Sequence, residues 1–151
     1  MNKYMQEAIS EAYTGINAGH GGPFGAVIVR DGRIIGRGHN CVVKNSDPTC
    51  HGEIMAIRDA CKNVYDFSLK GCDIYTTAQP YPMCMGATLW AGIDRVFYGC
   101  NIADSEDIGF KDSDFYKVLN GETPFCIEET DRDECLKLFE DYKKIENKTM
   151  Y

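Results

Sequence analysis

The sequence predicts a three-layer α/β/α protein, in which a mixed β-sheet is covered by helices on both faces. Two apolar runs flank Asp31-Gly32, a dipeptide typical of a tight β-hairpin. After this hairpin, segments with helical periodicity alternate with short apolar runs, as they do where crossover helices join the strands of a sheet. An antiparallel hairpin followed by such crossovers gives a mixed sheet.

Each element follows from its own apolar pattern. Met5, Ile9 and Ile16 lie at helical spacing and predict a first helix over residues 2–18. Strands are predicted over 24–30, 33–39, 72–77 and 95–99, and further helices over 51–62, 82–91, 115–119 and 131–145. No repeat, low-complexity tract or linker interrupts this pattern, so we expect a single domain over residues 1–151.

Composition limits the partners. A chain of 151 residues that is 44% hydrophobic can bury one core. With 16 basic and 23 acidic side chains, the net charge is −7. Binding a nucleic-acid backbone requires clustered Lys and Arg, so we expect no nucleic-acid partner, whereas a free base or nucleoside remains compatible.

The N-terminus and the cysteines together indicate a cytoplasmic protein. The first residues have neither the apolar run of a signal peptide nor a membrane span, so we expect no membrane association. Cysteines in the cytoplasm stay reduced. Six of the eight, namely Cys41, Cys61, Cys72, Cys100, Cys126 and Cys135, are therefore interpreted as small buried hydrophobes.

The tripeptide His51-Gly52-Glu53 combines a metal-type ligand with a general acid or base. Positions i and i+2 do not share a helix face, so the two side chains can converge only if His51 lies at the first turn. Cys84 follows Pro82, which opens another helix. The two segments together predict a metal site at which bound zinc would lower the pKa of water from about 15.7 to about 7.

These residues resemble a known signature. His51-Gly52-Glu53, followed by Pro80 and Cys84, is similar to the H-x-E…P-C-x-x-C pattern of the zinc nucleobase deaminases. The resemblance implies that His51 and Cys84 hold zinc and that Glu53 carries protons between water, the base and the leaving ammonia. The first cysteine of the family pair is Tyr81 here.

The wider chain resembles the bacterial guanine deaminases, which have the cytidine-deaminase fold. The matching positions are residues 21–29, Asn40, residues 47–49, Asp112 and Tyr151. The resemblance implies a five-stranded mixed sheet, a small nucleobase as substrate, and a homodimer. It also implies that residues 131–151 cross to the partner subunit, where Tyr151 closes the pocket.

The same resemblance assigns the base-binding residues. Phe24 would be the wall on which the purine ring stacks. Asp112 suits guanine because a carboxylate accepts two parallel hydrogen bonds, and guanine offers N1–H beside its 2-amino group. Asn40, with an amide donor and acceptor, would complement the remaining edge of the base.

Tyr81 leaves three interpretations open. The protein is a guanine deaminase, a deaminase of another aminated ring such as cytosine or a pterin-like base, or a non-catalytic binding or regulatory module whose metal site Tyr81 has abolished. A phenol oxygen reaches further from its Cα than a sulfur does, so Tyr81 would overshoot the zinc unless its loop retreats. Cys50, the nearest spare thiol, would point about 100° away from His51 on a regular helix.

Overall fold

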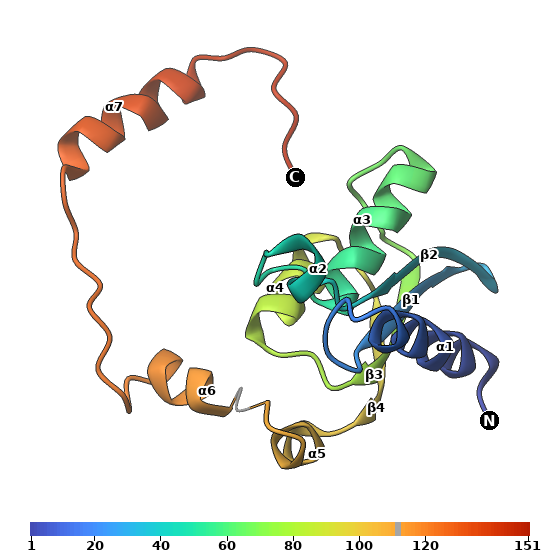
Figure 1. Ribbon diagram of the computed structural model, residues 1–151. Helices are drawn as coiled ribbons and strands as arrows, with labels where there is room; N and C mark the ends of the chain where they lie inside the picture. The colour runs from blue at the N-terminus through green and yellow to red at the C-terminus, as the bar shows by residue number, and fades with distance from the viewer. Residues whose placement is uncertain (111–112) are drawn as a thin grey trace. The chain divides into compact units, whose positions relative to one another are not determined.

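A four-stranded sheet forms the centre of the computed structural model, which describes residues 1–110 and 113–151. Its strands are β1 (Gly25–Arg30), β2 (Arg33–His39), β3 (Cys72–Ala78) and β4 (Arg95–Cys100), in the order β2-β1-β3-β4. Strand β1 pairs antiparallel with β2 and β3, whereas β3 and β4 are parallel. The sheet is therefore mixed, as the sequence predicts (Figure 1).

The hairpin between β1 and β2 turns at the predicted dipeptide. Asp31 has a φ of 50° and Gly32 a φ of 75°. Positive φ at both central residues is the geometry of a type I′ turn, whose twist matches that of the flanking strands. The hairpin prediction is confirmed.

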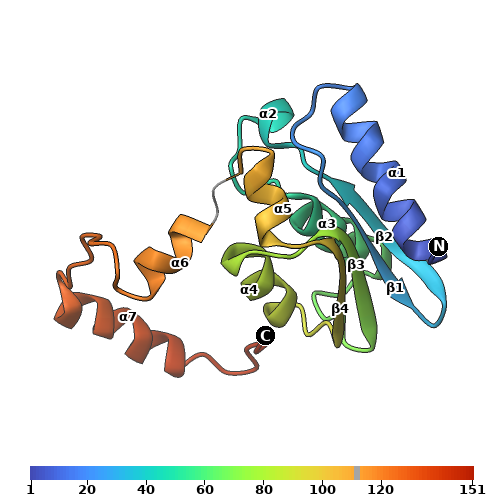
Figure 2. The same cartoon turned by 90° about the horizontal axis from the view of Figure 1, so that it is seen from below.

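Helices cover both faces of the sheet. Ala26 and Ile28 of β1 belong to a buried cluster with Ala56 and Ala60 of α3 (Gly52–Val64). Val27 and Val29 point to the opposite face, where Tyr4 of α1 (Lys3–Asn17) packs on them. This alternation follows from the two-residue period of a strand. Figure 2 shows α1 on one side of the sheet and α3 with α4 (Pro82–Trp90) on the other.

Glycine in β2 brings α3 close to the sheet. A Cβ atom on Gly38 would lie 2.7 Å from the carbonyl oxygen of Gly52 and would also press on the amide nitrogen of Ala56. The helix backbone therefore rests directly on the strand backbone. This contact places the first turn of α3, and with it His51, at one end of the sheet.

The predicted count of five strands is wrong. Among the described residues the sheet has four strands, and β4 is followed at once by α5 (Ile102–Asp107) instead of a chain reversal along its free edge. Residues 124–130 have no regular secondary structure. Two short helices, α2 (Val42–Asn45) and α5, were not predicted.

The chain divides into two compact units, Met1–Ser113 and Asp114–Tyr151. The first contains the sheet with α1 to α5. The helices α6 (Ser113–Leu119) and α7 (Arg132–Lys143) account for the regular structure beyond it. In the parts of the chain that the structure describes, no helix has the length and apolar character needed to cross a bilayer.

Candidate metal centre

Two helix starts bring the predicted site residues together. His51 is the N-cap of α3 and has an extended backbone, with φ −68° and ψ 159°. Its side chain therefore leaves the chain before the helical spiral begins and can point the same way as Glu53 in the first turn. Cys84 occupies the first turn of α4, which Pro82 opens. The positive ends of both helix dipoles favour a thiolate and other anions here.

The donor atoms of these residues form a close group. The Sγ atom of Cys84 lies 3.6 Å from Nδ1 of His51, and the Cys84 thiol donates a hydrogen bond to Oε2 of Glu53 at 3.5 Å. One donor atom from each of the three residues lies within 4.8 Å of the other two. Cys84 and Glu53 are buried, and His51 is half-buried.

The separation of His51 and Cys84 fits zinc. With a Zn–N bond of about 2.0 Å and a Zn–S bond of about 2.3 Å, tetrahedral ligands lie about 3.5 Å apart. The observed 3.6 Å agrees with that value. One imidazole, one thiolate and a neighbouring carboxylate are also donors that zinc accepts.

Glu53 lies in an environment that favours its protonated form. Burial raises the pKa of the Glu53 carboxyl above its ordinary value. A backbone N–H, the charge of His51 and hydrogen bonds from Cys84 and Thr76 oppose this effect without cancelling it. A carboxyl group whose pKa moves towards neutrality can both accept and donate a proton at physiological pH.

Thr76 is a site residue that the sequence analysis did not identify. It lies in β3, is fully buried, and hydrogen-bonds to the Glu53 carboxyl. The available signal was a polar pair, Thr76 and Thr77, directly after the apolar residues Ile74 and Tyr75 of the strand. Buried hydroxyls need partners, so such a residue indicates a polar neighbour across the core.

The turn before α3 fixes the direction of His51. Oδ1 of Asp47 accepts hydrogen bonds from the amide and the hydroxyl of Thr49, at 2.8 and 2.7 Å. Both contacts hold the pKa of Asp47 below its ordinary value, and the hydrogen bond from the hydroxyl has the larger effect. The Cys50 thiol donates to Oδ2 of the same carboxylate at 3.2 Å. The Cys50 side chain therefore points to Asp47. As expected, it does not belong to the group of His51, Glu53 and Cys84.

Tyr81 occupies the position immediately before α4. It is the N-cap of that helix and only 8% exposed, and its hydroxyl oxygen is buried. Its carbonyl accepts the Met85 N–H at 2.8 Å, so its backbone is part of the helix start that positions Cys84. The phenol is therefore packed into the protein and does not extend into solvent.

The predicted base-binding residues Phe24 and Asn40 are neighbours. The Asn40 N–H donates to the Phe24 carbonyl at 2.8 Å, and Oδ1 of Asn40 accepts the Val42 N–H at 3.1 Å. The half-buried Phe24 ring meets Phe110 edge to face, with centroids 4.8 Å apart. A Cβ on Gly52 would lie 2.8 Å from the Phe24 carbonyl oxygen, so this segment adjoins the start of α3.

Asp112 and Tyr151 are the other two predicted site residues. Asp112 lies outside the described residues. Tyr151 belongs to the second unit, in which it is exposed. Their assigned contacts with a base stay predictions.

Comparison with known proteins agrees with this geometry. Residues 1–100, which include His51, Glu53 and Cys84, match the cytidine and deoxycytidylate deaminase zinc-binding region. The chain belongs to this deaminase family. Within the family signature, Tyr81 stands at the first cysteine of the pair.

Individual deaminases extend the similarity. Guanine deaminase of Bacillus subtilis (strain 168) is 47% identical over 117 residues, which are 78% of this chain and 75% of that protein. An X-ray structure of guanine deaminase from Bacillus subtilis matches with a TM-score of 0.93 at 41% identity, covering 100% of this chain and 99% of that one. The tRNA-specific adenosine deaminase of Aquifex aeolicus (strain VF5) is 37% identical over 95 residues, 63% of this chain and 62% of that protein.

Proposed function

We propose that this deaminase hydrolyses guanine to xanthine and ammonia. The observation that carries the proposal is the convergence of His51, Cys84 and Glu53 at two helix starts, with donor spacing that fits zinc. The similarity to a guanine deaminase, which spans the whole chain in structure, supports guanine as the base.

The chemistry divides between the metal and Glu53. A zinc ion held by His51 and Cys84 would supply a water nucleophile that is acidic enough to react near neutral pH. Glu53 would accept a proton from the water that attacks C2 of the purine, and would return one to the ring nitrogen. It passes a proton to the amino group, which leaves as ammonia when the C–N bond breaks. Thr76 holds the Glu53 carboxyl in place for these transfers.

Recognition of the base is assigned to residues around the Phe24–Asn40 contact. The Phe24 ring stacks on the purine, and Asn40 hydrogen-bonds to its edge. Because Oδ1 of Asn40 already accepts the Val42 N–H, its amide nitrogen supplies the donor for the base. Asp112 accepts N1–H together with the 2-amino group, a pair of donors that adenine and cytosine lack.

We also propose a cytoplasmic homodimer in which Tyr151 closes the pocket of the partner subunit. Helix α7 has no buried residue, and Leu138 and Phe139 on it are 67% and 62% exposed. Apolar side chains of this size are normally covered, and a second copy of the chain would cover them. All eight cysteines are free thiols, which suits a reducing compartment.

The experiment that tests the function is ammonia release from a panel of bases by the zinc-loaded protein. Guanine should be deaminated, whereas adenine and cytosine, which lack its pair of donors, should not; pterin, which has such a pair, tests the fit of the ring. A Cys84→Ser variant is the matched control, because it should lose the zinc ion of this site and, with it, turnover. Ammonia release from cytosine or from pterin, with none from guanine, would show that the other base is the substrate. Stoichiometric base binding without ammonia release would support the non-catalytic module that Tyr81 suggests.

A further inference from the structure

A second group of metal-type donors contains none of the residues His51, Glu53 and Cys84. It consists of His20, in the loop after α1, His39, the last residue of β2, and Cys41, two residues further on. Nδ1 of His20 and Nε2 of His39 are 2.9 Å apart, and one donor atom of each residue lies within 4.8 Å of the others. The two groups of donors share no residue.

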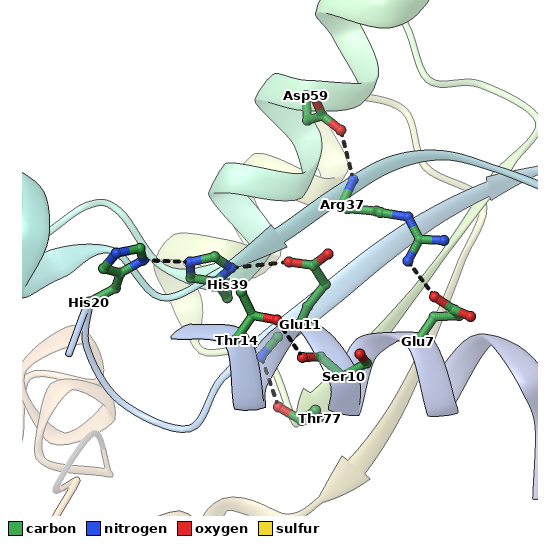
Figure 3. Close-up of polar contacts among 10 residues, drawn as sticks. Glu7, Ser10, Glu11, Thr14, His20, Arg37, His39, Asp59 and Thr77 are labelled. Carbon is green, nitrogen blue, oxygen red and sulfur yellow. Dashed lines mark hydrogen bonds and ion pairs between the residues drawn. The ribbon is translucent and has the colours of Figure 1, made fainter. Parts of the chain in front are cut away.

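Glu11 orients His39 as a ligand. Its Oε2 lies 3.0 Å from Nδ1 of His39, the ring nitrogen that faces away from His20 (Figure 3). A carboxylate at this position holds the proton on Nδ1 and leaves the Nε2 lone pair directed at the cluster. Histidines that bind metals almost always have such a partner on the second nitrogen. Arg37 does not compete for Glu11, because its guanidinium pairs with Glu7.

Glycine and backbone contacts hold both imidazoles in place. A Cβ on Gly15 would lie 2.7 Å from Cδ2 of His39, so that ring packs directly against the backbone of α1. The His20 carbonyl accepts the N–H groups of Val43 and Lys44, at 3.0 and 3.1 Å. The two rings are nearly parallel, with an interplanar angle of 20°. The site is therefore organised before any ligand arrives.

The protonation states suit metal binding. Desolvation, followed by the positive charges of Lys44 and His39, lowers the pKa of His20, which favours the neutral imidazole. Nδ1 of His20 and Nε2 of His39 share one hydrogen bond, so a metal ion would displace the proton that lies between them. Cys41 is 5% exposed, and burial raises the pKa of its thiol despite the opposing charge of Lys44. A metal ion would displace that proton, as it does at other cysteine ligands.

We propose that His20, His39 and Cys41 form a second metal site, with Zn²⁺ or another borderline divalent transition metal as its ligand. Two imidazoles and one thiolate are a donor set typical of such ions. A tetrahedral zinc would need about 3.3 Å between the two nitrogens, so the rings must separate by only a few tenths of an ångström. The Cys41 thiolate and the Glu11 carboxylate together balance the charge of a dication.

An open hollow supplies the route of entry. It has a volume of about 450 Å³, and its lining includes His39, Cys41, Glu11 and Lys44. A fourth ligand to the metal, water or a small anion, can reach the ion from this hollow. The metal would link the loop at His20 to His39 and Cys41, the two neighbours of Asn40 in the chain. Its role would therefore be to stabilise the predicted base-binding segment.

Zinc content per protomer tests the proposal, and the comparison of variants separates it from the proposed active site. After dialysis against metal-free buffer, elemental analysis should find about two zinc ions in the parent and about one in Cys41→Ser or in His20→Gln. His51→Ala should also retain about one, because its remaining ion is at the second site. Cys61→Ser, which alters a half-buried thiol outside both groups, should retain the parental content.

Cobalt substitution identifies the sulfur ligand. In a Cys84→Ser variant, a sulfur-to-cobalt charge-transfer band should persist, and adding Cys41→Ser should remove it, whereas adding Cys61→Ser should not. If Cys41→Ser does not fold, His20→Gln replaces it in this experiment, because His20 lies in a loop. Adding His20→Gln to Cys84→Ser should weaken the charge-transfer band.

The proposal is overturned if Cys41→Ser and His20→Gln hold as much zinc as the parent and the Cys84→Ser protein has no sulfur band. If Cys41→Ser loses zinc and His51→Ala keeps the parental content, the second site is supported, and the result counts against zinc binding at the proposed active site. The two failures are therefore distinguishable.

Discussion

The thiol of Cys84 donates a hydrogen bond to the carboxylate of Glu53, across the contact between two helix starts. This single interaction connects the proposed metal ligand to the proposed proton carrier. Glu53 therefore has one direct neighbour at the metal and a second, Thr76, on the sheet. Its replacement should affect proton transfer more than metal binding.

Glu53→Gln should lower kcat for guanine by about 10²-fold to 10⁴-fold, the usual contribution of a positioned general acid or base. The amide keeps the shape of the side chain but cannot exchange protons. Zinc content and the dissociation constant for guanine should stay close to those of the parent. Steady-state kinetics with elemental analysis checks this expectation, and undiminished turnover would show that another group carries the protons.

The same substitution should stabilise the metal-free protein at neutral pH. Burial raises the folded-state pKa of Glu53 above the unfolded value of about 4.3, so its contribution to stability is complete below that pH and is lost as pH rises through the folded-state pKa. Glutamine cannot ionise and escapes this loss. With a chelator present, Tm of Glu53→Gln should exceed that of the parent near pH 7, and the difference should close below about pH 4.

Glu146→Gln is the matched control for this pH dependence, because Glu146 is exposed. Its Tm should follow the parent at every pH. A parallel rise in both variants would assign the effect to net charge instead of to the burial of Glu53.

Deleting residues 147–151 should raise KM for guanine about tenfold, equivalent to about 1.4 kcal/mol of lost contact. The reason is the proposed closure of the pocket by Tyr151 of a second copy. Tm of the sheet unit should change little, whereas the dimer should dissociate at higher protein concentration than the parent dimer does. Tyr151→Phe keeps the ring and should preserve most of the affinity. An unchanged KM in the truncated protein would leave the segment without this role.

Tyr81→Cys should bind zinc more tightly, since a second thiolate completes three protein ligands and leaves a position open for water. At reference pKa values, forming a phenolate at pH 7 requires roughly 4 kcal/mol and forming a thiolate requires roughly 2 kcal/mol. The difference between these two free energies corresponds to about a 30-fold gain in zinc affinity. Competition with a chelator measures this change. Deaminase activity should rise with it.

Tyr81→Phe separates ligation from packing in that experiment. It removes the hydroxyl without adding a thiolate, so zinc affinity should not rise. If the parent holds zinc stoichiometrically and both variants lose activity, Tyr81 is a working part of the site and not a replaced ligand.

The strands and long helices could be predicted because each carries a strong local pattern. The Asp31-Gly32 turn and the continuous apolar run of β1, which is buried on both faces, are of this kind. Helix α2, with four residues, is too short to show periodicity. Helix α5 begins with a capping box formed by Asn101 and Asp104, and the three-residue spacing of these two side chains is the sequence signal of its start.

The metal centre and the second cluster differ in how far sequence reasoning reaches. His51 and Glu53 are two residues apart in the chain, so their convergence could be argued from helix geometry alone. His20 and His39 come from separate elements, and only the packing of α1 on β2 brings them together. The fifth strand was expected from the resemblance and had no sequence pattern of its own to support it.

The hydrogen bond between the Asn40 N–H and the Phe24 carbonyl has an evolutionary consequence, because it joins main-chain atoms only. The side chain at position 24 can be exchanged by mutation while this frame persists, whereas the buried Asn40 side chain also accepts the Val42 N–H and is part of the frame. A lineage of such enzymes could therefore diversify in the bases it accepts by changes at position 24 without first losing stability, and laboratory selection for a new substrate should begin there.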